Sequence, residues 1–405
     1  MRIGIDGSCL ANRRGFGRFA RQTLQALAGA ESPHEFVVFV DRPSLDQVDV
    51  PDRCEVVPVK VTEAPSRAAS STGRRRLGDM LAMGRATARA RLDLMFFPAT
   101  YSFFPVWKVG RVVVTMHDTL ALAHPELVFP TWRGRMAWAL KEHLAARRAD
   151  LIMTVSETSR RDLLAWFRLP EHRVQVMAEG PDAVFGPRPL GQYSDATLFR
   201  YGVDPHQRFL LYVGGLSPHK NLPRLIEAYA RSQLSLEGTS LVLVGDTGDV
   251  FHTHVPALRE TVCRWGLGDR VVFTGFVPDN DLVYFYNRAE ALVQPSLMEG
   301  FGLPPVEAMA CGKPVVSSTA GSLPEVVGDA GLFFDPTDVG AIAAALRRII
   351  DDPGLRVSLA AKARDRAKHY TWEGAARSLL DAFEGLGTPP TRRPAAPLRA
   401  RRRIA

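Results

Sequence analysis

The clearest indication of the architecture is the stretch Gln294-Pro-Ser-Leu-Met-Glu-Gly-Phe-Gly-Leu-Pro-Pro-Val-Glu-Ala-Met309. An apolar run at residues 291–294 leads into it and predicts a short buried strand. A loop that contains glycine follows, and Pro304 and Pro305 then predict the first turn of a helix, where proline is tolerated. A strand, a loop and a helix in this order are the repeating unit of a parallel α/β sheet.

The same alternation extends over nearly the whole chain. Short, continuous apolar runs are typical of strands buried on both faces. Such runs lie at residues 2–6, 35–41, 94–97, 112–116, 151–155, 209–213, 240–244, 271–274, 291–294, 314–317 and 331–334. Helical patterns lie between them, for example at residues 19–28, 135–147, 222–231 and 339–350. We therefore expect an α/β fold of parallel sheets joined by right-handed crossovers.

The strands form two series, which predicts two Rossmann-like, doubly wound domains facing each other across a cleft, at residues 1–190 and 191–370. The break falls within residues 180–204, where proline and glycine repeatedly interrupt any periodicity. Residues 371–388 predict a final helix. The remaining residues, 389–405, have the composition of a disordered basic tail.

Most of the positive charge lies in that tail. The formal net charge of the 405 residues is +8, and residues 389–405 carry six arginines and no acid. Subtracting these six charges leaves +2 for residues 1–388. A nucleic-acid-binding body would carry a basic face, so we expect no nucleic-acid partner. We expect the tail to contribute nothing to the fold and to favour an anionic membrane surface.

The composition excludes several other classes of protein. A hydrophobic content of 46% and a charged content of 23% are ordinary for a globular chain, and they exclude a disordered chain, a collagen or a disulfide mini-protein. The four cysteines form no C-x-x-C pair, so we expect neither a zinc site nor a disulfide framework. Reduced thiols, and the lack of a visible secretory signal or membrane-spanning run, favour a cytoplasmic protein.

The loop after residues 291–294 has the features of an anion site. The backbone N–H groups of Phe301, Gly302 and Leu303 would point outward from a helix N-terminus, which suits a pyrophosphate. Glu299 and Glu307 bracket these groups. A carboxylate accepts two hydrogen bonds from a vicinal diol, so Glu307 suits a ribose and Glu299 a hydroxyl of a second sugar. Taken alone, Glu307 would more simply complement the helix dipole.

The block Glu299-Gly-Phe-Gly-Leu-Pro-Pro-Val-Glu307 resembles the signature of family 4 retaining glycosyltransferases, which have the GT-B fold. Other segments resemble the family in order and position: Thr115-Met-His-Asp118, Thr154-Val-Ser-Glu157, Tyr212-Val-Gly-Gly-Leu-Ser-Pro-His-Lys-Asn221, Leu243-Val-Gly-Asp246 and Thr274-Gly-Phe-Val-Pro-Asp279. The resemblance covers nearly all residues before the basic tail. It implies that the C-terminal domain binds the donor, that the N-terminal domain binds the acceptor, and that the last helix crosses back to the N-terminal domain.

The resemblance also implies roles for single residues. Lys220 would give a point charge to the donor diphosphate, in the phosphate-binding loop that contains Gly214 and Gly215. His117 would face the donor sugar, and Val277 would offer backbone groups to the base. Many members carry an arginine in the phosphate loop as well. This chain has Leu216 and His219 beside Lys220, so its second phosphate cation is missing or comes from elsewhere.

Residues 15–20 need a separate test, because they fit G-x-G-x-x-A, a weak dinucleotide-binding fingerprint. That fingerprint follows its strand immediately, whereas residues 7–14 intervene here. An NAD-dependent dehydrogenase would also leave Glu299, Glu307 and Lys220 unexplained. We therefore favour the family's interpretation, in which Gly15 and Gly17 form a loop whose backbone approaches the donor phosphates.

Two further features allow more than one interpretation. Tyr101, Phe103, Phe104 and Trp107 follow the strand at residues 94–97 and would either contact an acceptor or pack against a helix. The arginines at positions 74–76, 85, 89 and 91 form either a solvated helix face or an anionic-membrane patch.

We expect a retaining, metal-independent hexosyltransferase of the cytoplasm, peripheral on the inner face of the membrane if the tail binds there. It would have no cofactor beyond its nucleotide-sugar co-substrate, and a GDP-sugar such as GDP-mannose is favoured over a UDP-sugar. The acceptor would be a glycan or lipid-linked glycan of cell-envelope or exopolysaccharide synthesis. The catalytic residues would be His117, Glu299 and Lys220. The alternatives are a nucleotide-sugar epimerase or hydrolase of the same fold, and a non-catalytic nucleotide-sugar-binding protein.

Overall fold

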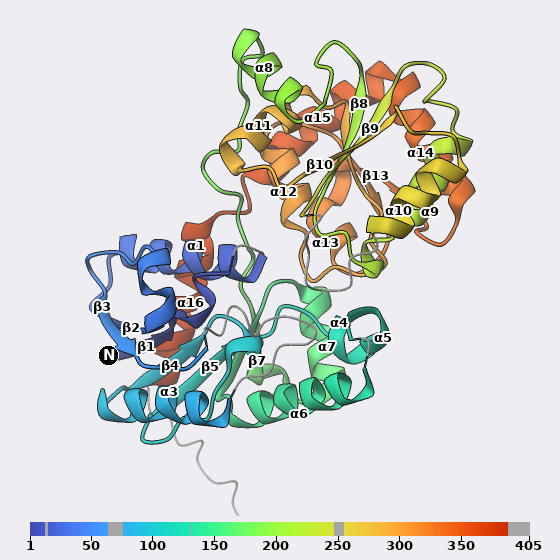
Figure 1. Cartoon of the computed structure of the whole chain (residues 1–405). Coiled ribbons are helices and arrows are strands. Elements are labelled where there is room, and N and C mark those ends of the chain that lie inside the picture. The colour runs from blue at the N-terminus through green and yellow to red at the C-terminus, as the bar shows by residue number, and fades with distance from the viewer. Residues whose placement is uncertain (13–14, 64–75, 130, 247–254, 388–405) are drawn as a thin grey trace, which may run out of the picture.

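The computed structural model describes residues 1–12, 15–63, 76–129, 131–246 and 255–387. Arg74 and Arg75 of the arginine cluster, and the basic tail at residues 389–405, lie outside the described residues. Two parallel sheets, of seven and six strands, dominate the chain, one in each half (Figure 1). The α/β class and the two Rossmann-like units predicted from the sequence are thus confirmed.

The N-terminal sheet has the order β3-β2-β1-β4-β5-β6-β7, and every neighbouring pair is parallel. Its strands are β1 (Arg2–Asp6), β2 (Glu35–Asp41), β3 (Glu55–Val59), β4 (Leu94–Phe97), β5 (Arg111–Thr115), β6 (Leu151–Thr154) and β7 (Val174–Val176). The helices of this half are α1 (Gly15–Gly29), α3 (Leu77–Arg89), α4 (Leu120–Ala123), α5 (Pro125–Val128), α6 (Trp132–Arg148) and α7 (Glu157–Phe167).

The C-terminal sheet has the order β10-β9-β8-β11-β12-β13 and is also parallel throughout. Its strands are β8 (Phe209–Val213), β9 (Ser240–Val244), β10 (Val271–Gly275), β11 (Ala291–Gln294), β12 (Val315–Ser318) and β13 (Gly331–Phe334). The helices are α8 (Gln192–Arg200), α9 (Leu222–Arg231), α10 (Val255–Arg264), α11 (Asp279–Arg288), α12 (Leu303–Ala310), α13 (Leu323–Val327), α14 (Val339–Asp351), α15 (Pro353–Ala367) and α16 (Trp372–Gly387).

The predicted strands are confirmed to within one residue at each end, but two strands were missed. Both lie at the edges of the N-terminal sheet: β3 at one edge and β7 at the other. β3 is mostly exposed and contains Pro58, and β7 has only three residues. Proline cannot donate to a neighbouring strand and is confined to sheet edges, so Pro58 weakens the strand signal of β3, and three residues are too few to mark β7 as a strand.

Helices cover both faces of the N-terminal sheet. On one face, Phe19 of α1 and Phe383 of α16 share a core with Phe96 of β4. On the other face, Met83 of α3 and Ala145 of α6 belong to a separate core with alternate residues of the same strands. The side chains of a strand alternate between the two faces, so α3 and α6 share the face opposite to α1 and α16.

The last helix, α16, joins the two halves. It follows α15 of the C-terminal half, yet it packs along α1, as the red and blue helices in Figure 1 show. The ring of Phe383 lies 5.7 Å from that of Phe96, edge to face, and Trp372 lies 6.0 Å from Phe19. This packing anchors the C-terminal end of the chain on the N-terminal sheet. Among the described residues, no helix is both long enough and apolar enough to cross a bilayer.

Candidate functional site

The loop between β11 and α12 takes the conformation that an anion site requires. Gly302 precedes the helix with φ of +105°, a backbone angle that residues with a side chain rarely adopt. Within the described part of the chain, the N–H groups of Phe301, Gly302 and Leu303 donate to no protein acceptor. These groups stay available at the positive end of the helix dipole, as predicted from the sequence.

Glu299 is held in a polar cluster within the C-terminal half. Its Oε1 atom accepts hydrogen bonds from Lys220 Nζ at 2.7 Å, Gln294 Nε2 at 2.8 Å and Ser296 Oγ at 2.7 Å. The Lys220 and Glu299 side chains are only 16% and 12% exposed. Burial is the largest influence and opposes ionisation, but the Lys220 ammonium and the hydrogen bonds that Glu299 accepts together outweigh it and hold the pKa of Glu299 below its ordinary value. Glu299 is therefore a carboxylate, paired with the cation expected to serve the donor diphosphate.

Lys220 is placed by the residue that follows it. Lys220 ends a 3-10 turn, Pro218–Lys220, and Asn221 then takes a left-handed conformation with φ of +61° before α9. The Asn221 amide donates to the carbonyls of Pro295 and Pro336, at 3.0 and 2.8 Å. The buried amide fixes the turn against the β11–α12 loop, so Lys220 reaches Glu299 from a rigid support.

The glycines before this turn let three backbone segments meet. A Cβ atom at Gly214 would lie 2.8 Å from the Tyr212 hydroxyl, and Gly214 has φ of +151°. The same hydroxyl donates to the carbonyl of Gly215. A Cβ atom at Gly245, after β9, would lie 2.3 Å from the Gly214 carbonyl. The sequence Gly214-Gly215 thus provides a closely packed turn between β8 and Lys220.

Glu307 is neutralised from the other half of the molecule. Arg18, in the first turn of α1, forms ion pairs with Glu307 and with Asp279 at the start of α11. The Tyr286 hydroxyl donates to the second carboxylate oxygen of Glu307 at 2.7 Å. Glu307 is 1% exposed, and the Arg18 side chain is 24% exposed. Arg18 also lies over the Phe185 ring, 5.8 Å from its centre.

The two glutamates differ in how well their charge is compensated. Burial raises the pKa of Glu307 above its ordinary value, and Arg18 and the Tyr286 hydroxyl offset only part of that rise. Glu307 in turn raises the pKa of Arg18, which stays charged. As the pH falls, Glu307 is therefore protonated before Glu299.

Further contacts hold the two halves together at this loop. The Ser156 and Ser159 hydroxyls donate to the Gly300 carbonyl at 2.7 and 3.1 Å. A Cβ atom at Gly300 would lie 2.5 Å from the His117 carbonyl. On α13, Glu325 accepts hydrogen bonds from the first N–H groups of α7. The loop that contains Glu299 thus lies directly against the N-terminal half.

The His117 side chain is enclosed within the N-terminal half. Its Nδ1 lies 3.3 Å from Oε1 of Glu179, and its Nε2 lies 3.2 Å from the Pro98 carbonyl. The rings of Phe16 and Phe19 meet it edge to face, at 5.0 and 4.5 Å. Each ring nitrogen thus has an oxygen atom of the N-terminal half as its neighbour. At 11% exposure, its side chain presents little surface to a ligand.

The glycine-rich block at residues 15–20 differs from the expectation. The predicted loop is wrong, because α1 begins at Gly15 and both glycines belong to its first turn. A Cβ atom at Gly17 would lie 1.7 Å from the Asn12 carbonyl, whereas Gly15 has open space around it. Gly17 is thus required for close packing of the preceding chain. The residue of this block that reaches the site is Arg18.

Three further residues of the motifs have defined surroundings in the structure. Asp118 accepts a hydrogen bond from the Leu120 N–H at 2.8 Å, so it orients the backbone of its own loop. Val277 is buried between β10 and α11. Burial lowers the pKa of His219 to about 3, so this imidazole is neutral and supplies no second phosphate cation.

On the acceptor side, the aromatic loop is buried. Tyr101, Phe103 and Phe104 are at most 6% exposed, so packing, and not an open stacking surface, is the role the structure gives them. Beneath this loop, Glu142 of α6 accepts a hydrogen bond from Thr100 at 2.7 Å, and its other oxygen has no hydrogen-bond partner among the described residues. Burial raises the pKa of Glu142 to about 7.

The structure therefore brings together Glu299, Lys220, Glu307 and the free N–H groups of the β11–α12 loop. Sequence reasoning missed Arg18 and Glu179, which contribute ions from the N-terminal half. Arg18 had a signal, because it directly follows Gly17 in the glycine-rich block. Glu179 had none, because it lies in the irregular segment between the two sheets. The described residues include no group of three or more His, Cys, Asp or Glu placed to hold a metal ion.

Comparison with known proteins agrees with this arrangement. Residues 194–366 match the family model described as glycosyl transferases group 1, and this segment includes Lys220, Glu299 and Glu307. Residues 14–180 match the glycosyl transferase 4-like domain, which includes Arg18, His117 and Glu179.

Relatives with assigned activities support the same placement. The chain is 36% identical, over 290 residues, to O-antigen chain mannosyltransferase B of Escherichia coli, covering 70% of this chain and 73% of the relative. It is also 29% identical to the serotype-specific mannosyltransferase WbdA of Escherichia coli. That match covers 68% of this chain but only 34% of the longer WbdA protein. In fold it is similar to sucrose-phosphate synthase from Thermosynechococcus elongatus, with a TM-score of 0.76 at 21% identity over 96% of this chain and 99% of that one. The chain belongs to the group 1 glycosyl transferases and has their GT-B fold.

Proposed function

We propose that this glycosyltransferase moves mannose from GDP-mannose, with retention of configuration and without a metal ion, to a glycan or lipid-linked acceptor of cell-envelope or exopolysaccharide synthesis. One observation carries the proposal: two buried glutamates flank a helix N-terminus whose N–H groups are free, and Lys220 lies beside one of them. This arrangement suits a sugar joined to a nucleoside diphosphate. The relative at 36% identity is a mannosyltransferase, which favours mannose as the sugar.

In this proposal each group of the loop has a separate task. The N–H groups of Phe301, Gly302 and Leu303 receive the diphosphate, and Glu307 accepts hydrogen bonds from the ribose diol. Glu299 accepts from a hydroxyl of the transferred sugar. Lys220, now paired with Glu299, faces the charge that develops on the departing diphosphate and stabilises it.

Transfer then needs no residue that forms a covalent bond with the sugar. The bond between the anomeric carbon and the β-phosphate oxygen breaks, and the acceptor oxygen bonds to that carbon on the same face. The acceptor proton passes to the departing phosphate oxygen, so the products are a free nucleoside diphosphate and a glycoside of the original configuration. Lys220 and the helix N-terminus supply the positive potential that a metal ion would otherwise provide.

In this proposal Arg18 is the second phosphate cation, which the loop around Lys220 lacks. It comes from the N-terminal half, and both of its ion-pair partners, Glu307 and Asp279, are acids of the C-terminal half. A ribose diol on Glu307 competes directly with Arg18. An Arg18 released from Glu307 is within side-chain reach of the same binding region and carries the positive charge that His219 lacks.

The proposal is tested by supplying purified protein with GDP-mannose, UDP-glucose or ADP-glucose and a mannose-terminated oligosaccharide. Thermal stabilisation by GDP and GDP-mannose, with release of GDP only when the oligosaccharide is present, is the expected result. Stabilisation by a UDP-sugar alone would reject the choice of base. GDP release without acceptor would favour a hydrolase or epimerase, and binding without release would favour a non-catalytic binding protein. Proton NMR of the new anomeric centre decides between retention and inversion.

A further inference from the structure

The outer side of α6 carries an apolar stripe that nothing in the described chain covers. Trp132, Met136, Leu140 and Leu144 recur at every fourth residue and are 63%, 63%, 62% and 52% exposed. Side chains at this spacing lie on one side of a helix. Single exposed apolar residues are ordinary on a protein surface, but four large ones in a continuous row mark an interaction site.

Apart from Ala137, the other exposed residues of α6 are basic. Arg133, His143 and Arg147 are exposed, whereas Glu142 is buried, so the exposed surface of this helix carries no Asp or Glu. An amphipathic helix with large apolar side chains among arginines has the composition of a helix that lies in the interface of an anionic bilayer.

Helix α3 extends this surface on the same face of the sheet. Leu77 and Leu81 are 74% and 41% exposed, and Arg85 and Arg89 continue their row at the same four-residue spacing. Asp79, the acid of this helix, is buried, where it caps Thr62. The outward row of α3 thus repeats the pattern of α6, with apolar residues at one end and cations at the other.

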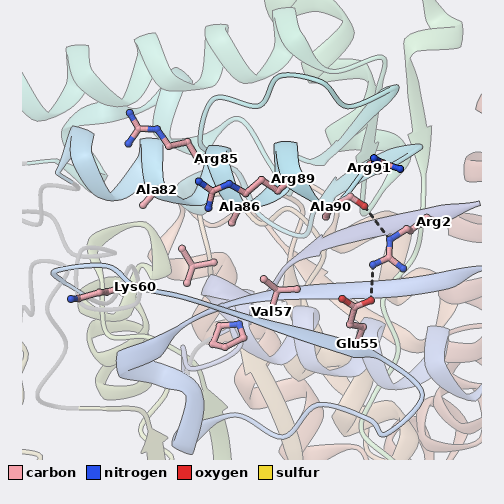
Figure 2. A pocket seen from close by; sticks show the side chains of 12 residues that line it. Arg2, Glu55, Val57, Lys60, Ala82, Arg85, Ala86, Arg89, Ala90 and Arg91 are labelled. Atoms are coloured by element: carbon pink, nitrogen blue, oxygen red, sulfur yellow. Dashed lines mark hydrogen bonds and ion pairs between the residues drawn. The ribbon is translucent and has the colours of Figure 1, made fainter.

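A basic groove lies along the inner edge of that row. It has a volume of about 820 Å³ and runs between α3 and β3, with Lys60, Arg85, Arg89 and Arg91 among its lining. In Figure 2 the Arg85 and Arg89 side chains follow α3, with Lys60 near one end of the groove and Arg91 near the other. Among the cations that line the groove in Figure 2, Arg2 alone is drawn in an ion pair, and its partner is Glu55. The other four cations form no ion pair with any described residue, so the groove suits phosphate groups.

We propose that the α3–α6 face of the N-terminal half is a docking surface for an anionic phospholipid bilayer. Trp132, Met136, Leu140 and Leu144 enter the headgroup region, and the groove cations bind lipid phosphates. The opposite charge of the lipid selects this occupant, because a second copy of the chain would place one set of arginines against another. Both helices lie along the edge of the molecule away from the C-terminal half in Figure 1, so a bilayer there leaves that half clear.

The docking surface also connects to the donor side of the molecule. Trp132 follows α5 closely in the chain, and α5 contacts the turn Pro218–Lys220. A bilayer bound to α6 would therefore place an acceptor carried by a lipid close to the element that positions Lys220. The proposal is independent of the transfer proposed above, because vesicle binding requires neither donor nor acceptor.

The test is co-sedimentation of the full chain with vesicles of phosphatidylglycerol and phosphatidylcholine, and with vesicles of phosphatidylcholine alone. Met136→Ser with Leu140→Ser, and separately Arg85→Gln with Arg89→Gln, each change one part of the surface. Leu236→Ser with Val357→Ser is the matched control, because both residues are exposed, at 82% and 72%, on the C-terminal half. The basic tail is present in every variant, so its attraction to lipid is common to all.

We expect the first pair to weaken binding to the anionic vesicles by about tenfold or more, since two large side chains lose their burial. The arginine pair should weaken it too, most at low salt, and the control should bind as the unchanged chain does. Brominated lipid should quench the fluorescence of Trp132, so this quenching should be absent in Trp132→Phe. Unaltered binding in both surface pairs, or no binding to anionic vesicles, overturns the proposal. Self-association that the Met136 and Leu140 changes abolish, without lipid binding, identifies a second copy as the occupant and overturns it as well.

Discussion

Glu299 and Glu307 lie eight positions apart in one loop and helix, and little of either side chain is exposed, yet their charges are compensated from different halves of the molecule. Glu299 pairs with Lys220 of its own sheet, through elements that pack rigidly together. Glu307 pairs with Arg18, which belongs to the other sheet. A ligand that binds Glu299 changes contacts within one domain. A ligand that binds Glu307 breaks an ion pair between the two domains.

In the function proposed above, this difference suits the two carboxylates to different stages, Glu307 to donor binding and Glu299 to bond breaking. An interaction with the nucleotide is made as soon as the donor binds, and a contact between domains is well placed to respond to that binding. An interaction with the transferred sugar and its leaving group changes as the bond breaks, and it benefits from rigid support. Their pKa values follow the same division, lowered at Glu299 and raised at Glu307.

Lys220→Met should have the largest effect. Removing a positive group that faces developing charge typically lowers turnover by about a hundred- to a thousandfold. The change also leaves Glu299 buried without its cation, so the melting temperature should fall. In the double variant Lys220→Met/Glu299→Gln both charges are gone, and the melting temperature should recover while transfer stays low. Sugar transfer and thermal melting of the three variants provide the measurement.

Lys362→Met is the matched control, because Lys362 also pairs with an acid but lies on the surface, 47% exposed. Its transfer rate should match that of the unchanged protein. Recovery of transfer together with stability in the double variant would show that Lys220 acts only by supporting the loop.

Glu142 provides a third buried glutamate for the comparison. Its pKa is raised to about 7, so above that pH the folded chain holds a buried charge that the unfolded chain exposes to water. This penalty is absent below the unfolded pKa and grows as pH rises to the folded value. Glu142→Gln should therefore stabilise the protein at pH 8 by on the order of 3 kcal/mol, and by little at acid pH.

Urea unfolding at the two pH values measures that difference. Glu260→Gln is the control, since Glu260 is 71% exposed and should give no pH-dependent change. An equal effect of Glu142→Gln at both pH values would mean that Glu142 keeps an ordinary pKa in the folded protein.

Arg18→Met should have the smallest effect at neutral pH, less than about tenfold on donor affinity, because one cation is lost while one competitor for Glu307 is removed. Its clearer effect is on pH dependence. A protonated Glu307 accepts fewer hydrogen bonds, so donor affinity falls as pH decreases through its pKa. Without Arg18, less of the rise caused by burial is offset, and the fall should begin at a higher pH than in the unchanged protein.

Titration with GDP-mannose across the acid range measures this shift, since its diphosphate diester does not titrate there. Glu307→Gln should give a flat profile over the same range. Identical pH profiles for Arg18→Met and the unchanged protein would show that Arg18 does not affect the titration of Glu307.

The sequence predicts the central strands well for a physical reason. Strands buried on both faces, such as β4 and β8, must be continuously apolar, and this pattern is visible in one dimension. The edge strand β3 is mostly exposed and includes Pro58, which cannot donate a hydrogen bond to a neighbouring strand. Pairing with a neighbour, not composition, makes it a strand.

The site divides in the same way. Glu299, Glu307 and the free N–H groups lie in one loop and its helix, where spacing alone relates them. Arg18 joins the site only when the two halves meet, because its contacts with Glu307 and Asp279 depend on how the domains dock. Glu179 reaches His117 within the N-terminal half, from the irregular segment after β7, and no local pattern in the sequence indicates that pair.

The division of labour between the two glutamates is tested most directly by calorimetric titration of Glu299→Gln and Glu307→Gln with GDP. Glu307→Gln should weaken GDP binding by about ten- to a hundredfold, the usual effect of losing a charged hydrogen-bond acceptor of about 1.5–3 kcal/mol. Glu299→Gln should leave GDP affinity nearly unchanged while lowering mannose transfer, because GDP lacks the sugar that Glu299 contacts. Equal losses of GDP affinity in the two variants would contradict the account.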